Sequence, residues 1–103
     1  MASLRIKDIQ VTQRVLNRSE QIGSLVASIQ ADENIEKIIL QRHRGVIQVW
    51  VGHHRLAAYH LAGREELFDG EYELIEGQTG RHRFGTIEDL ISWTLEPDHV
   101  PRG

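Results

Sequence analysis

The sequence predicts a small α/β domain of the α+β type, in which a mixed sheet packs against about three helices. A dense run of β-branched and aromatic residues at 46–51 is typical of a strand, and the helix-forming residues that follow it end at Gly63. The apolar residues within 22–29 repeat with the spacing of one helix face. Apolar and acidic residues alternate at 71–76, which is typical of a strand at the edge of a sheet.

The segments at the two ends of the chain supply further elements. Alternation of apolar and polar residues at 4–11 predicts an N-terminal strand. Ser19 is a suitable N-cap for a helix at about 20–30, and Thr86 is a suitable N-cap for the last helix. Both caps rest on the ability of a hydroxyl oxygen to accept a hydrogen bond from the first helical turn.

The central region predicts a hairpin followed by a helix. A strand at 37–41 is expected to pair with the strand at 46–51, because Gly45 in the connection can adopt a positive φ. Strict alternation in the second strand predicts that three residues share one face: Ile47, Val49 and Val51. Apolar residues then cover most of the circumference of the next helix, which predicts packing on two sides: Leu56, Ala57, Ala58, Leu61 and Ala62.

The length of 103 residues leaves room for one domain, which we assign to 1–96, with a flexible C-terminal tail at 97–103. The absence of cysteine excludes disulfides, thiolate nucleophiles and cysteine metal sites. The N-terminus has no apolar signal core, and no apolar run approaches the length of a membrane span. We therefore expect a cytoplasmic protein that does not associate with membranes.

The charges are distributed unevenly along the chain. The net charge is −3, yet the segment 37–64 holds five of the 12 Lys and Arg residues, four of the six histidines and none of the 15 Asp and Glu residues. An otherwise acidic chain therefore has one long zone without carboxylates. This zone is centred on the predicted junction between the strand at 46–51 and its helix.

That junction reads Gly52-His53-His54-Arg55. Gly52 allows the chain to turn sharply and a ligand to approach the backbone. The free N–H groups and the macrodipole of a helix N-terminus favour an anion, whereas cationic side chains there are unfavourable when nothing negative is bound. The pattern predicts capture of a phosphate or carboxylate, with Arg55 pairing to the anion. The alternative is that His53 covers the helix end while Arg55 pairs with a surface glutamate.

Two other features near the junction have competing interpretations. Trp50 is either a packing residue or a platform on which a base can stack. His53 and His60 lie about 10 Å apart along a helix, which is too far to share one metal ion, so no protein-ligated metal site is predicted. Glu65, Glu66 and Asp69 are either a solvated acidic face or oxygen donors to magnesium held by phosphates.

The junction resembles the ParB/sulfiredoxin superfamily. Its ParB-like members carry a strand that ends in Gly-x-x-Arg before a helix that opens with small residues, as in the run from Gly52 to Ala58. The closing Leu61-Ala62-Gly63 and the Leu25-Val26-Ala27-Ser28-Ile29 ending of the earlier helix extend the resemblance over about residues 4–75. The resemblance implies a ParB/sulfiredoxin-like fold of the Gly-His-His-Arg, stand-alone type.

The resemblance also implies which residues meet the ligand. Superfamily members bring nucleotide phosphates to the strand–turn–helix, which points to Gly52, His53, His54 and Arg55 here. Their arginine-containing loop corresponds to Arg14 and Arg18, which are weaker candidates.

This chain departs from its relatives at two positions. Sulfiredoxins need a cysteine where this chain has His53, so sulfiredoxin activity is excluded. Kinase-type members usually carry Asp where this chain has Val51, which removes a residue that would assist metal-dependent phosphoryl transfer.

The leading functional hypothesis is a domain that binds the phosphates of a nucleotide (ATP, ADP or CTP), with or without Mg²⁺, and transfers or hydrolyses phosphate. If the chain is an enzyme, it is a nucleotide-dependent phosphotransferase or nucleotide hydrolase; no catalytic residue can be named from the sequence. The second hypothesis is a non-catalytic module that holds DNA, RNA or a partner protein through the same basic zone. A nuclease comes third, because no carboxylate cluster stands beside the turn. The oligomeric state is left open.

Overall fold

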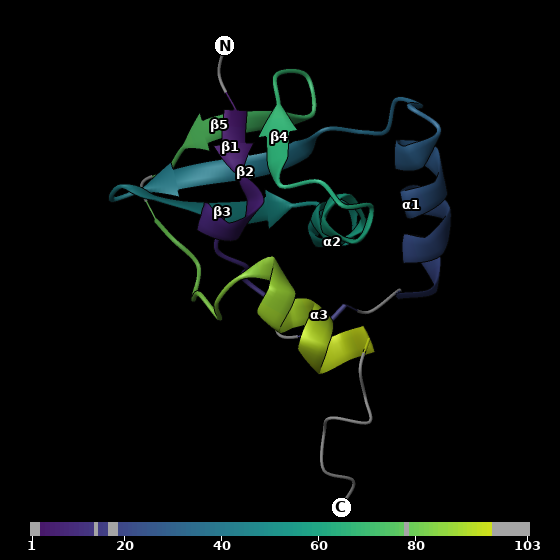
Figure 1. The fold of residues 1–103 in the computed structure, drawn as a ribbon. Helices are drawn as coiled ribbons and strands as arrows, with labels where there is room; N and C mark the ends of the chain where they lie inside the picture. Colours follow the sequence, from purple (N-terminus) through teal and green to yellow (C-terminus); the bar gives the residue numbers. More distant parts are fainter. Residues whose placement is uncertain (1–2, 14, 17–18, 78, 96–103) are drawn as a thin grey trace, which may run out of the picture.

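A computed structural model describes residues 3–13, 15–16, 19–77 and 79–95, which form a mixed α/β fold (Figure 1). The strands are β1 (Ser3–Arg5), β2 (Ile38–His43), β3 (Val46–Val51), β4 (Glu66–Phe68) and β5 (Tyr72–Glu76). The α-helices are α1 (Ile22–Gln30), α2 (His53–Leu61) and α3 (Ile87–Leu95), and the 3₁₀ turns are η1 (Ile6–Asp8) and η2 (Ser19–Gln21). No helix within the described residues has the length and apolarity that a bilayer crossing requires. The expected tail at 97–103 lies outside these ranges.

The main sheet has the order β3-β2-β5, with β2 in the centre. β2 pairs with β3 in an antiparallel hairpin and with β5 in parallel, so the sheet is mixed as expected. β5 is an edge strand, and its acidic residues suit that position. A second, two-stranded sheet joins β1 to β4, which the sequence did not predict. The fold class is confirmed, although the strands form two small sheets instead of one.

α2 is the central helix of the molecule. It packs against α1, α3 and β2, and Figure 1 shows it end-on between the sheet and α1. Leu56, Ala57 and Ala58 are fully buried, and Gly63 follows the helix with a φ of 91°. The predicted packing on two sides is confirmed. Leu61 was expected to be buried but is 44% exposed, because α2 ends there and its last turn extends past the core.

The N-terminal segment differs from the predicted strand. Only Ser3–Arg5 pairs as a strand, and η1 then interrupts the alternation. The tight 3₁₀ turn brings Ile6 and Ile9 to the same side, where both are buried. Gln10 then forms a parallel bridge to Gln48 along the outer edge of β3. The expected helix at 20–30 also begins differently, because Ser19 lies inside η2 and α1 starts only at Ile22.

The predicted hairpin and the predicted cap of α3 are both confirmed. Arg44 and Gly45 form the turn of the hairpin with φ values of 54° and 79°. The Thr86 N–H donates to the Asp89 carboxylate over 3.0 Å, and the Asp89 N–H donates to the Thr86 hydroxyl over 3.4 Å. This reciprocal pair is a capping box, which satisfies N–H groups that the helix itself cannot.

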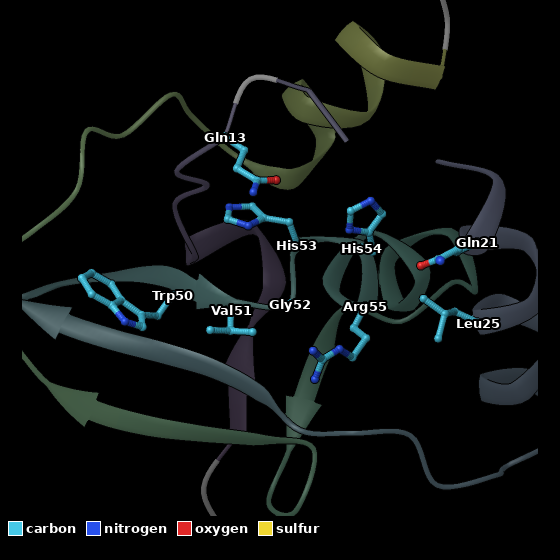
Figure 2. A pocket seen from close by; sticks show the side chains of 9 residues that line it. All are labelled: Gln13, Gln21, Leu25, Trp50, Val51, Gly52, His53, His54 and Arg55. Atoms are coloured by element: carbon cyan, nitrogen blue, oxygen red, sulfur yellow. The ribbon is translucent and has the colours of Figure 1, made fainter. Parts of the chain in front are cut away.

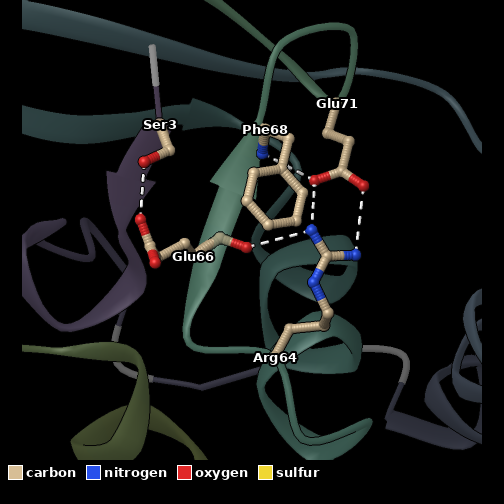
Figure 3. Close-up of polar contacts among 5 residues, drawn as sticks. All are labelled: Ser3, Arg64, Glu66, Phe68 and Glu71. Carbon is tan, nitrogen blue, oxygen red and sulfur yellow. Dashed lines mark hydrogen bonds and ion pairs between the residues drawn. The ribbon is translucent and has the colours of Figure 1, made fainter. Parts of the chain in front are cut away.

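A guanidinium–carboxylate pair fastens the end of α2 to the smaller sheet (Figure 3). Arg64 donates to both carboxylate oxygens of Glu71, over 3.1 and 2.6 Å, and also to the backbone carbonyl of Glu66. Glu71 in turn accepts the Phe68 N–H over 2.7 Å. The bidentate geometry fixes the turn between β4 and β5 relative to the central helix.

Alanine substitutions at two glycines test the packing of the fold, because one glycine has open space around it and the other is in close contact with a buried side chain. We expect Gly23→Ala to raise the free energy of unfolding by about 0.4–1 kcal/mol, because Gly23 is helical, exposed and has no atom near an added Cβ. Gly77→Ala should lower it by about 1–3 kcal/mol, because a Cβ there would lie 1.5 Å from Nε2 of buried Gln41. Urea denaturation measures both changes, and a stabilising Gly77→Ala would contradict the packing described.

Candidate functional site

The junction between β3 and α2 turns at Gly52, which has φ 111° and ψ 33°. This left-handed conformation favours glycine, and an added Cβ would also lie 3.4 Å from Ile38. The register of β2 against β3 shifts just before the turn: Ile39 faces Val51 and Leu40 faces Val49, which leaves Trp50 as an extra residue. Such a bulge bends the strand and redirects side chains.

The bulge overturns one prediction about β3. Val49 is fully buried as expected, but Val51 is 47% exposed instead of sharing its face. The extra residue at Trp50 breaks the two-residue period, so the side chain of Val51 is released from the core. Val51 lines a surface cavity instead.

This cavity has a volume of about 410 Å³ and opens at the N-terminus of α2 (Figure 2). It draws residues from β3, from the turn, from the first turn of α2 and from the region of α1. The lining residues are Gln13, Gln21, Leu25, Trp50, Val51, Gly52, His53, His54 and Arg55. The structure thus brings the four predicted residues of the turn to one cavity, and its lining contains no carboxylate. Arg14 and Arg18 lie outside the described residues.

His53 is held as a neutral imidazole. The Thr12 N–H donates to its Nε2 over 3.0 Å, so that nitrogen is an acceptor and the proton lies on Nδ1. Burial, followed by the charges of Arg81 and His54, lowers the pKa of His53 from 6.5 to about 4. The Thr12 hydroxyl donates to the Val49 carbonyl over 2.9 Å and fixes Thr12 beside β3. His53 was expected to donate to an anion, but its Nε2 instead anchors the segment that runs along β3.

Arg55 lines the cavity with its stem and directs its guanidinium elsewhere. Its Nη1 donates to the Lys37 carbonyl and lies 3.8 Å from the Glu36 carboxylate. Figure 2 shows the guanidinium pointing away from His53 and His54. The Glu36 side chain is 89% exposed, and an ion pair with so exposed a partner contributes little. The structure therefore shows the alternative in which Arg55 pairs with a surface glutamate, and the same guanidinium also holds the Lys37 carbonyl.

Arg81 is a residue of this site that the sequence analysis missed. Its guanidinium lies 3.7 Å from the centre of the Trp50 ring and donates to the Trp50 carbonyl over 2.8 Å. Its charge acts on His53, as the lowered pKa of that imidazole indicates. One face of Trp50 is therefore covered by a cation. The signal for Arg81 in the sequence is the run of residues 77–85, which contains two arginines, one histidine and no carboxylate.

The acidic residues considered as magnesium donors lie elsewhere. Glu65 and Glu66 line a separate cavity of about 470 Å³ together with Arg5, His60 and Arg64. Asp69 forms a backbone bridge to Tyr72 in the turn before β5. Among the described residues, no three His, Asp or Glu side chains converge as metal ligands would.

The lowered pKa of His53 predicts a pH dependence of stability. Between pH 6.5 and about 4 the unfolded chain binds a proton that the folded His53 does not. The free energy of unfolding should therefore fall as the pH falls through this window, by up to about 1.4 kcal/mol per pH unit. Urea denaturation at pH 7, 6 and 5 measures the slope, and His53→Gln should lose this part of it. Equal slopes in both proteins would show that His53 is not buried in its neutral form.

Comparison with known proteins identifies the family of the chain. The family model of the ParB N-terminal domain matches residues 1–68. The match runs from β1 to the end of β4 and includes all nine residues that line the cavity. No curated protein matches the chain. Because the family model covers 68 of the 103 residues, this chain belongs to the ParB N-terminal domain family.

Proposed function

We propose that the cavity at the β3–α2 turn binds the phosphates of a nucleotide such as ATP, ADP or CTP. The observation that carries this proposal is an open cavity of about 410 Å³ at the start of a nine-residue helix, with no carboxylate in its lining. The volume lies within the range of small-molecule sites, about 300–1,000 Å³. The membership of the ParB N-terminal domain family adds weight, since the related superfamily members described above bring nucleotide phosphates to the same turn.

The N-cap of α2 supports binding of an anion. Gly52 has no side chain that can accept hydrogen bonds from the first helical turn, and that turn contains no acidic residue. A phosphate oxygen in the cavity can take the place of the missing cap and interact favourably with the helix dipole. Gly52 has no Cβ, which also leaves the approach to its backbone open.

The side chains around the cavity would contribute to phosphate binding in different ways. His53 is neutral, and its hydrogen bond to Thr12 fixes the turn in place. It therefore contributes no positive charge to the cavity. His54 lines the cavity from the first turn of α2, and Arg55 would reach a phosphate oxygen by turning its guanidinium from the Lys37 carbonyl and Glu36. Arg81 adds positive potential from beside Trp50. Mg²⁺ would arrive bound to the nucleotide, because the lining offers it no carboxylate.

Phosphate transfer or hydrolysis at this site would depend on positioning and charge neutralisation. The lining contains no carboxylate that can act as a general base, and His53 already uses its Nε2 as an acceptor for Thr12. The contribution of the protein would then be the fixed geometry of the turn and its positive potential. Nucleotide binding is therefore the part of the proposal that is tested first.

We expect His54→Glu to abolish nucleotide binding and His54→Gln to retain most of it. Both variants remove the contacts of the imidazole, and they differ in the negative charge that repels phosphate. The glutamate should not destabilise the free protein, because a negative charge in the first turn of a helix is favourable by about 0.3–1 kcal/mol. Thermal-shift measurements with ATP, ADP, CTP and GTP, with and without Mg²⁺, supply the readout. A bound nucleotide at a hundred times its dissociation constant should stabilise the native chain by about 2.7 kcal/mol.

Two results would contradict the proposal. One is that no nucleotide stabilises the native chain at millimolar concentration. The other is that His54→Glu binds a nucleotide as tightly as His54→Gln does, which would place the phosphates away from the start of α2. Calorimetric titration of the best nucleotide against both variants settles the second point.

A further inference from the structure

The cavity of about 470 Å³ that was noted above lies at the end of α2 opposite to the turn at Gly52. It is formed by the N-terminal segment, the end of α2, the residues that begin β4 and the first turn of α3, and it shares no lining residue with the cavity at the turn. Its charged lining residues are Arg5, Lys7, Arg64, Glu65, Glu66 and Glu88. Three cations and three carboxylates are therefore gathered in one cavity.

The walls of this cavity are fixed by the smaller sheet. β1 and β4 pair with Arg5 opposite Glu66, and the Ile6 N–H donates to the Glu65 carbonyl over 2.9 Å. Ile6 lines the cavity and is 2% exposed, so it also belongs to the core. The backbone on two sides of the cavity is thus held in place by the fold itself.

Two of the six charged side chains already have partners within the protein (Figure 3). Arg64 donates to both carboxylate oxygens of Glu71. Glu66 accepts the hydroxyl of Ser3 over 2.5 Å, although the register places Arg5 directly opposite Glu66. Arg64 and Glu66 therefore belong to the frame of the cavity, and they are not its free binding groups.

The other four charges are not neutralised by the protein. Within the described ranges, none of the side chains of Arg5, Lys7, Glu65 and Glu88 forms an ion pair. The two cations lie on the N-terminal segment, whereas the two carboxylates lie beside β4 and in α3. The cavity therefore keeps its free positive and free negative groups on separate elements.

This distribution selects the charge of a ligand. An anion would be attracted by the two free cations but repelled by the three carboxylates, and a cation would meet the reverse. A molecule that carries both an ammonium group and a carboxylate can satisfy both sets of groups. His60 also lines the cavity, at the C-terminal end of α2, where the helix dipole favours an ammonium group. The volume lies within the range of small-molecule sites, about 300–1,000 Å³.

We propose that this cavity binds a small dipolar ion, either a free α-amino acid or a short peptide, through its two charged groups. The carboxylate of the ligand pairs with Arg5 and Lys7, and its ammonium group pairs with Glu65 and Glu88. The proposal does not rest on nucleotide binding at the β3–α2 turn. Glu88 lies outside the residues 1–68 that match the family model, so the complete cavity is not contained in that match.

The test uses the full chain, labelled with ¹⁵N, in NMR titrations with the standard L-amino acids and with the dipeptide Ala-Ala. We expect saturable shifts of the amide signals of residues 5–7, 64–66 and 88, and no shift at His54. The amino-acid and dipeptide titrations distinguish the two sources of the dipolar ion. Each ligand that binds is compared with its N-acetyl and its amide derivative, which each lose one of the two charges. Both derivatives should bind about fivefold more weakly or worse.

Substitutions on the two sides of the cavity test the two ends of the ligand. Lys7→Gln and Glu88→Gln should each weaken binding by about two- to fivefold, as expected for the loss of one exposed ion pair. Lys37→Gln and Glu73→Gln remove the same charges from exposed positions outside the cavity, and they should leave the affinity unchanged. Circular dichroism checks that each variant is folded.

Three outcomes would overturn the proposal: no saturable shift with any amino acid or with Ala-Ala at millimolar concentration, a derivative that binds as tightly as its parent, or equal losses for the cavity variants and their controls. The two proposals can fail separately. Lys7→Gln should keep its thermal shift with the best nucleotide, and His54→Glu should keep its affinity for the dipolar ligand.

Discussion

The positive φ of Gly52 is the constraint on which the arrangement of the molecule depends. It ends β3 beside Ile38 and directs α2 back across the core, where Leu56, Ala57 and Ala58 are fully buried. The hydrogen bond from the Thr12 N–H to His53 then ties the N-terminal segment to the same turn. The fold and the cavity therefore share one determinant. A residue with a Cβ at Gly52 would strain the backbone and crowd Ile38 at the point where the cavity opens.

The electrostatics of the turn are milder than the sequence Gly-His-His-Arg implies. His53 is neutral because it is buried and lies near Arg81, and the guanidinium of Arg55 points toward Lys37 and Glu36. The argument that cations oppose the helix dipole thus loses much of its force for these two residues. The case for an anion rests instead on a cavity free of carboxylates at a helix start whose N-cap has no side chain. This is a property of the fold, and the residue types alone do not show it.

The sequence predicted those elements whose residue propensities and turn residues all lie within one short segment. Propensities and turn chemistry predicted the limits of β3, the hairpin turn at Gly45, Thr86 as the N-cap of α3, and Gly63 as the residue that closes α2. Features that depend on distant contacts were missed. The bulge at Trp50 arises from pairing with β2, and β4 forms because β1 is there to pair with it. Arg81 reaches the site across 31 residues of sequence, and no local period indicates such a contact.

Arg81 links the two regions of positive potential. It covers Trp50, which lines the cavity at the turn, and it also lines a separate cavity of about 310 Å³ beside the hairpin, together with Arg44 and Arg83. Its charge is the second cause, after burial, of the lowered pKa of His53. A phosphate held by Arg81 would offset that charge, so the pKa of His53 would rise toward its ordinary value while burial still kept it low. An anion that pairs with Arg81 would therefore act on the imidazole that holds the turn, even though the lining residues of the two cavities do not overlap.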